Sequence, residues 1–80
     1  MEFDDDTYDI IGAAMRVHNT LGPGLREKPY ENALTIELRE SGFHPLQQHP
    51  FPIHYHEKIV GDCIPDITIP NTLIIEVKAV

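Results

Sequence analysis

The chain has 80 residues, which is long enough for one small domain with a modest core. Hydrophobic residues make up 41% and charged residues 24% of the sequence, which is typical of a globular protein and excludes a wholly disordered chain. No apolar run is long enough to cross a membrane, and the single cysteine, Cys63, excludes an internal disulfide framework. We therefore expect a cytoplasmic domain in which Cys63 is a small core residue.

The net charge of −7 argues against nucleic acid as a partner, because such binding depends largely on neutralisation of phosphates by Lys and Arg. The charge is unevenly spread, however. Five of the thirteen acidic residues lie within the first nine positions, which leaves eight acidic residues against six basic ones in the rest of the chain. If three of those eight bind a metal, the remainder is close to neutral, and a nucleic-acid partner stays open.

We expect residues 1–7 to form a flexible acidic leader. Asp6 or Thr7 is expected to cap a first helix. The sequence Gly22-Pro23-Gly24 ends this helix, since neither residue type continues one. Its apolar stripe consists of Ile10, Ala14, Val17 and Leu21, widened by Ile11 and Met15.

A second helix is predicted over residues 26–41. Pro29 is tolerated only in the first turn of a helix, which places the start at Glu27 or Lys28. Gly42 is the expected residue after the last turn, because glycine readily adopts the left-handed conformation found there. One side of this helix consists of Tyr30, Ala33, Leu34, Glu37 and Leu38, and Ile36 widens its apolar face.

Three strands are predicted in the second half of the chain. The first covers residues 46–55, and because Pro50 and Pro52 cannot donate to a sheet ladder, it should be irregular or lie at an edge. The second and third cover residues 58–69 and 72–80, which are rich in Ile and Val and should form an antiparallel hairpin.

The register of this hairpin follows from its apolar pattern. If a loop of residues 70–72 brings Ile69 opposite Leu73, then Ile67 lies opposite Ile75, and every pair on that face is apolar. A shift by one residue mixes apolar and charged residues on both faces. The pattern therefore favours the three-residue loop.

The same register places Asp66 directly across from Glu76 on the other face, with Lys78 two residues further along. Like charges in direct opposition destabilise a sheet, but two carboxylates at that separation can share one cation. Their hard oxygen atoms suit Mg²⁺ or Mn²⁺. The alternative is a solvated face on which Lys78 pairs with one carboxylate; Ile74 and Val80 on the same face favour a site instead.

Two histidines offer a different kind of metal site. His54 and His56 share one face of a predicted strand and could chelate a transition metal. Histidines at this spacing are more often exposed polar residues at a strand edge. A His-based metal-binding protein is therefore the weakest of the alternatives.

Two motifs connect these residues with a known family. Pro65-Asp66, followed after nine residues by Glu76-Val77-Lys78, resembles the signature of the PD-(D/E)XK nuclease superfamily. Residues 17–34 and 48–52 resemble the GxxExxY proteins of that superfamily, and the resemblance extends from about residue 8 to the end of the chain. The run that names these proteins is spelled here by Gly24, Glu27 and Tyr30.

The resemblance implies an α+β restriction-endonuclease-like core in which a helix packs on a mixed sheet, with the order helix, helix, strand, strand, strand. Residues 8–80 would form this nuclease-like domain. Asp66 and Glu76 would hold Mg²⁺ or Mn²⁺, Glu27 would complete the acidic cluster, and Lys78 would orient or activate the attacking water. The implied partner is nucleic acid, with DNA favoured over RNA.

Members of this family continue past the motif with a further helix and strand, so the resemblance implies a C-terminally truncated domain. Such a domain would expose the apolar edge of residues 73–80, and we expect a homo-oligomer formed through that sheet edge or a helix face. The alternative to a nuclease is a non-catalytic acidic protein-interaction module that keeps the same fold.

Overall fold

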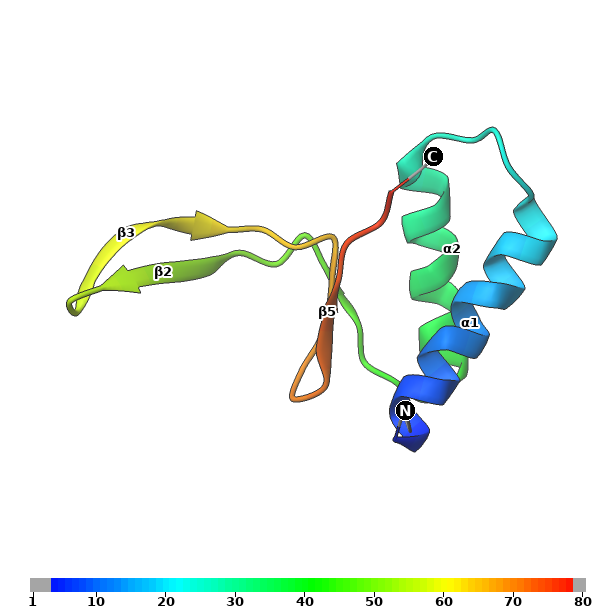
Figure 1. The fold of residues 1–80 in the computed structure, drawn as a ribbon, viewed down its shortest axis with the longest axis horizontal. Helices are drawn as coiled ribbons and strands as arrows, with labels where there is room; N and C mark the ends of the chain where they lie inside the picture. The colour runs from blue at the N-terminus through cyan, green and yellow to red at the C-terminus, as the bar shows by residue number, and fades with distance from the viewer. Residues whose placement is uncertain (1–3, 79–80) are drawn as a thin grey trace.

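The computed structural model describes residues 4–78. Two helices, α1 and α2, lie side by side, and a small sheet covers one side of them, while the hairpin β2–β3 extends away from this body (Figure 1). The molecule is accordingly elongated, with principal extents of 44 × 29 × 25 Å. Within the described range, no helix is long and apolar enough to cross a membrane.

Helix α1 spans Asp5–Leu21 and begins earlier than predicted. Its N-cap is Asp4, whose Oδ1 accepts a hydrogen bond of 2.8 Å from the backbone N–H of Thr7, so the expected caps Asp6 and Thr7 lie inside the first turn. Asp4 is the N-cap because its side chain accepts a hydrogen bond from a backbone N–H that has no partner inside the helix. The acidic residues that follow it interact favourably with the positive end of the helix dipole. The buried residues of α1 are Ile10, Ala13 and Val17. The other members of the predicted stripe are exposed: Ile11, Ala14, Met15 and Leu21.

Helix α2 spans Glu27–Glu40, as Pro29 in its first turn required. Gly42 follows with a positive φ of 93°, which confirms its predicted role. The N–H of Phe43 donates to the carbonyl of Leu38, and the N–H of Gly42 donates to that of Arg39, both at 3.0 Å. These two bonds form a Schellman motif that ends the helix and turns the chain toward the sheet.

The sheet against the helices has three antiparallel strands in the order β1-β4-β5, formed by Leu46–Gln47, Ile67–Ile69 and Leu73–Ile75. The predicted register is confirmed, since Ile67 pairs with Ile75 and Ile69 with Leu73. The loop between β4 and β5 has the predicted three residues, and Asn71 in it adopts a positive φ of 61°. Ile67 and Ile69 are buried against Leu34, Leu38 and the buried face of α1.

Two predicted strands are each divided. Residues 46–55 form β1 and, in a second sheet, β2 (Phe51–Tyr55); residues 58–69 form β3 (Lys58–Cys63) and β4. Pro50 and Pro65 stand at the two breaks, where a residue without an N–H cannot continue a ladder. The division lets the hairpin β2–β3 leave the body, and Cys63 is consequently exposed rather than part of the core.

The third predicted strand, 72–80, is also shorter than expected. Strand β5 ends at Ile75, and residues 76–78 pair with no strand within the described residues 4–78. The N–H of Val77 donates instead to the Asp66 carboxylate at 2.8 Å, so a side chain takes the place of a ladder bond. The predicted pairing of Asp66 with Glu76 therefore lies just beyond the last ladder pair, and residues 79 and 80 fall outside the described range.

Candidate active site

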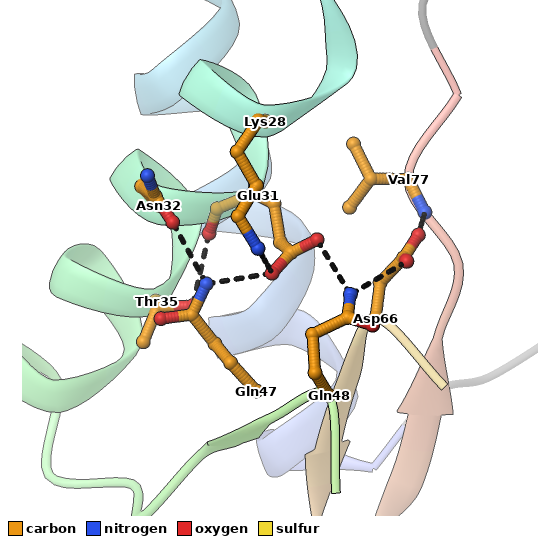
Figure 2. Close-up of polar contacts among 8 residues, drawn as sticks. All are labelled: Lys28, Glu31, Asn32, Thr35, Gln47, Gln48, Asp66 and Val77. Atoms are coloured by element: carbon orange, nitrogen blue, oxygen red, sulfur yellow. Dashed lines mark hydrogen bonds and ion pairs between the residues drawn. The ribbon is translucent and has the colours of Figure 1, made fainter. Parts of the chain in front are cut away.

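Two acidic side chains from separate elements face one another where α2 meets the sheet (Figure 2). Glu31 comes from the second turn of α2, and Asp66 directly precedes β4. We call these two residues the acidic pair. Gln48, the residue after β1, lies between them.

Glu31 is nearly inaccessible, with 4% of its surface exposed. Three donors satisfy its carboxylate: Oε2 lies 3.0 Å from Nζ of Lys28 and 2.6 Å from Nε2 of Gln47, and Oε1 lies 3.1 Å from Nε2 of Gln48. A buried carboxylate without such partners would cost several kcal/mol or more. The buried carboxylate of Glu31 is thus satisfied by donors from α2, from β1 and from the residue after β1.

Asp66 is partly buried and accepts two hydrogen bonds. Its Oδ2 accepts from the N–H of Val77 at 2.8 Å, and its Oδ1 accepts from Nε2 of Gln48 at 3.1 Å. The Val77 N–H is the main reason that the pKa of Asp66 is lowered from its usual value; burial opposes this shift, and Gln48, Glu76 and the positive charge of Lys28 assist it. Asp66 is therefore held in its charged form.

The acidic pair, Lys28 and the amide of Gln48 thus form one connected group of charges and donors at the edge of the core. A family model described as the PD-(D/E)XK nuclease superfamily matches residues 4–80, which include every member of this group. The chain belongs to the PD-(D/E)XK nuclease superfamily. Searches of curated proteins and of solved structures gave no match.

Membership of the superfamily agrees with the observed architecture. Two helices followed by small antiparallel strands are consistent with the expected α+β restriction-endonuclease-like fold. The mixed sheet that the resemblance implied is not found within residues 4–78, where all the strand pairs are antiparallel. The hairpin that was predicted to hold the site is formed by β4 and β5, and Asp66 lies at its open end. The finer assignment to the GxxExxY proteins stays a prediction.

The four site residues predicted from the nuclease signature lie in different surroundings. Asp66 belongs to the acidic pair, and Glu76 lies near enough to contribute to its lowered pKa. Glu76 and Lys78 are both exposed in the segment after β5, where they line a pocket of about 340 Å³ together with residues of α1, α2 and the loop between them. Glu27 is exposed at the first residue of α2.

Among residues 4–78, no three His, Cys, Asp or Glu side chains lie close enough together to hold a metal ion. The structure therefore does not bring Glu27, Glu76 and Asp66 together as one three-carboxylate cluster. His54 and His56 are exposed on the hairpin β2–β3. Two carboxylates lie near Asp66: Glu76, which assists the lowering of its pKa, and Glu31, which is joined to it through the amide of Gln48.

Glu31 and Gln48 are the members of the site that sequence reasoning missed. A signal for Glu31 was present, because it precedes Leu34 by three residues and Leu38 by seven, which places a charged residue on the buried face of α2. A carboxylate at such a position needs donors from elsewhere in the fold. Gln48 begins the segment 48–52 that resembles the GxxExxY proteins, but nothing in that segment indicated its contact with two carboxylates, which depends on a backbone turn after β1.

Asp66→Asn should remove part of the acid sensitivity of the fold. Because the pKa of Asp66 is lowered by folding, its charge contributes stability that is fully present above the pKa of the unfolded chain, about 4, and is lost as the pH falls through the folded pKa. Urea unfolding should show wild type more stable than the variant near neutral pH, with the difference shrinking below about pH 4.

The control is Asp62→Asn, which removes a carboxylate from the exposed strand β3. It should change the free energy of unfolding near neutral pH by no more than about 0.5 kcal/mol. If the free energies of unfolding of wild type and Asp66→Asn differ by the same amount at every pH, the role assigned to the Val77 hydrogen bond is contradicted.

Proposed function

We propose that this nuclease-like domain hydrolyses phosphodiester bonds with a divalent metal ion, acting on DNA in preference to RNA. Superfamily membership supports the reaction class. The observation that supports the site is the convergence of Glu31 and Asp66, from two elements, on the single amide nitrogen of Gln48.

The donor set suits Mg²⁺ or Mn²⁺. Mg²⁺ usually binds through one or two carboxylates and completes its coordination with water and substrate phosphate, so a cage of three acidic side chains is not required. Glu31 and Asp66 would hold the ion, and Glu76 and Glu27 remain further candidates from the signature. When bound, such an ion polarises the phosphate and lowers the pKa of an attacking water.

Protein donors contact both carboxylates of the acidic pair and offset their negative charge, as a bound cation would. The ammonium of Lys28 lies 3.0 Å from Oε2 of Glu31, and the Gln48 amide reaches both carboxylates. A nuclease also needs a cation near the charge that develops on the phosphate. Lys78 fills this role in the signature, while Lys28 is the lysine that the fold holds beside Glu31.

Cleavage assays with Mg²⁺ and Mn²⁺ on duplex DNA, single-stranded DNA and RNA test the proposal. Wild type should cleave DNA fastest and only with metal, and Asp66→Asn and Glu31→Gln should each lower the rate on the order of 100-fold or more. Comparison of the cleavage rates of Lys28→Met and Lys78→Met identifies the lysine that stabilises the charge developing on the phosphate. Glu57→Gln, in the turn of the exposed hairpin, is the matched control and should retain activity.

Cleavage that survives in both acidic-pair variants would contradict this site. Absence of cleavage and of any metal-dependent rise in melting temperature in wild type would favour the second candidate, a non-catalytic acidic module that binds a protein. The specific observation in favour of that candidate is that both carboxylates of the acidic pair accept from protein donors, which are Lys28, Gln47, Gln48 and the N–H of Val77.

We further propose that the chain forms a homodimer in the cytoplasm through the free edge of β5 or an adjoining helix face. β5 is an edge strand in the order β1-β4-β5, and Ile74 on it is 57% exposed. An apolar edge of this kind is a template for pairing with another strand.

Sedimentation at micromolar concentration should give a dimer for wild type. Ile74→Lys should shift the equilibrium to monomer, because a charge on an edge strand opposes pairing. Ile59→Lys, at an exposed position on the hairpin, is the control and should leave the dimer intact. A monodisperse wild-type monomer would contradict the proposed dimer.

A further inference from the structure

Gln48 has an uncommon backbone conformation at the point where the chain leaves β1 for the hairpin. Its φ is +52°, a region that residues other than glycine seldom adopt. Its N–H donates to the carbonyl of Asp66 at 3.0 Å. The backbone of Gln48 is thus tied directly to the residue whose carboxylate its side chain also contacts.

The side chain of Gln48 places one nitrogen between two negative charges. Nε2 lies 3.1 Å from Oε1 of Glu31 and 3.1 Å from Oδ1 of Asp66 (Figure 2). An amide nitrogen carries two N–H groups, so it can donate to both carboxylates at once. It thereby offsets the repulsion of two like charges held close together.

The neighbouring Gln47 provides a contrast. Its Nε2 donates to Glu31 at 2.6 Å and to Asn32 at 2.8 Å, and both acceptors belong to α2. No hydrogen bond joins Gln47 to Asp66 within residues 4–78. Gln48 is therefore the glutamine that connects the two members of the acidic pair.

We propose that Gln48 is a two-state member of the metal site, which donates its amide N–H groups to the acidic pair without metal and presents Oε1 to the cation with metal. This inference rests on the proposed function, since it takes Glu31 and Asp66 as the residues that hold the ion.

The two ends of the amide make both states accessible to one side chain. A half-turn about the last torsion of glutamine exchanges the nitrogen and oxygen positions while its shape hardly changes. Side-chain carbonyl oxygens are ordinary ligands of hard divalent cations. The Gln48 backbone, fixed by its bond to Asp66, would keep the amide at the pair in either state.

Gln48→Met separates this role from a purely structural one, because methionine has similar length but offers no N–H donor and no hard oxygen atom. If Gln48 only separates the carboxylates, the variant should bind Mn²⁺ more tightly than wild type, since the unrelieved repulsion then favours the cation. If Oε1 is a ligand, binding measured by calorimetry should weaken about tenfold or more. Under either role of Gln48, the melting temperature of Gln48→Met without metal should lie below that of wild type.

Gln47→Met is the matched control. It removes a donor from Glu31 but no proposed ligand, so it should bind Mn²⁺ no more weakly than wild type. Weakened binding in Gln48→Met but not in Gln47→Met supports the inference. Equal or tighter binding in Gln48→Met, while Asp66→Asn still abolishes binding, overturns the role of Gln48 and leaves the proposed metal site intact.

A second measurement uses wild type alone and applies even if Gln48→Met does not fold. Saturation with Mg²⁺ should move the side-chain amide resonances of Gln48 in an NMR spectrum, as both N–H groups leave the carboxylates. Unchanged resonances of Gln48 with Mg²⁺ bound would overturn the inference. A wild-type protein that binds neither Mg²⁺ nor Mn²⁺ would overturn both this inference and the metal dependence on which it rests.

Discussion

The buried carboxylate of Glu31 is the group on which the rest of the structure depends. This carboxylate is 4% exposed, and its partners are Lys28 of its own helix and the two amides of Gln47 and Gln48 at the end of β1. Because an unpaired charge at this depth costs several kcal/mol, the sheet has little freedom to slide along the helix. A single buried carboxylate thereby sets how the helices and the sheet of the domain meet.

The same contacts continue into the segment that carries the nuclease signature. Gln48 joins Glu31 to Asp66, and Asp66 in turn holds the backbone of Val77 after β5 ends. Fold and site are therefore not separable in this domain. A substitution that weakens the site should also loosen the junction of helix and sheet, so stability and activity need to be measured together for every variant.

Much of the fold was predictable because the determining signals are local. Alternating isoleucines set the register of β4 and β5, and Pro29 and Gly42 set the ends of α2. The sequence did not predict that two strands would each be divided, because a proline weakens a strand but does not determine the direction of the chain after it. Asp66 could be found from its apolar surroundings, but Glu31 could not be paired with it, since its donors Gln47 and Gln48 lie sixteen and seventeen positions away.

The most direct test of the role of Glu31 is the free energy of unfolding of Glu31→Gln in urea, with Glu27→Gln as the matched control on the same helix. The variant keeps the size of the side chain but turns an amide N–H toward donors, so a loss of about 1–3 kcal/mol is predicted. Glu27 is exposed, and its substitution should change stability by no more than about 0.5 kcal/mol. Equal, small effects of the two substitutions would contradict the dependence of the fold on Glu31.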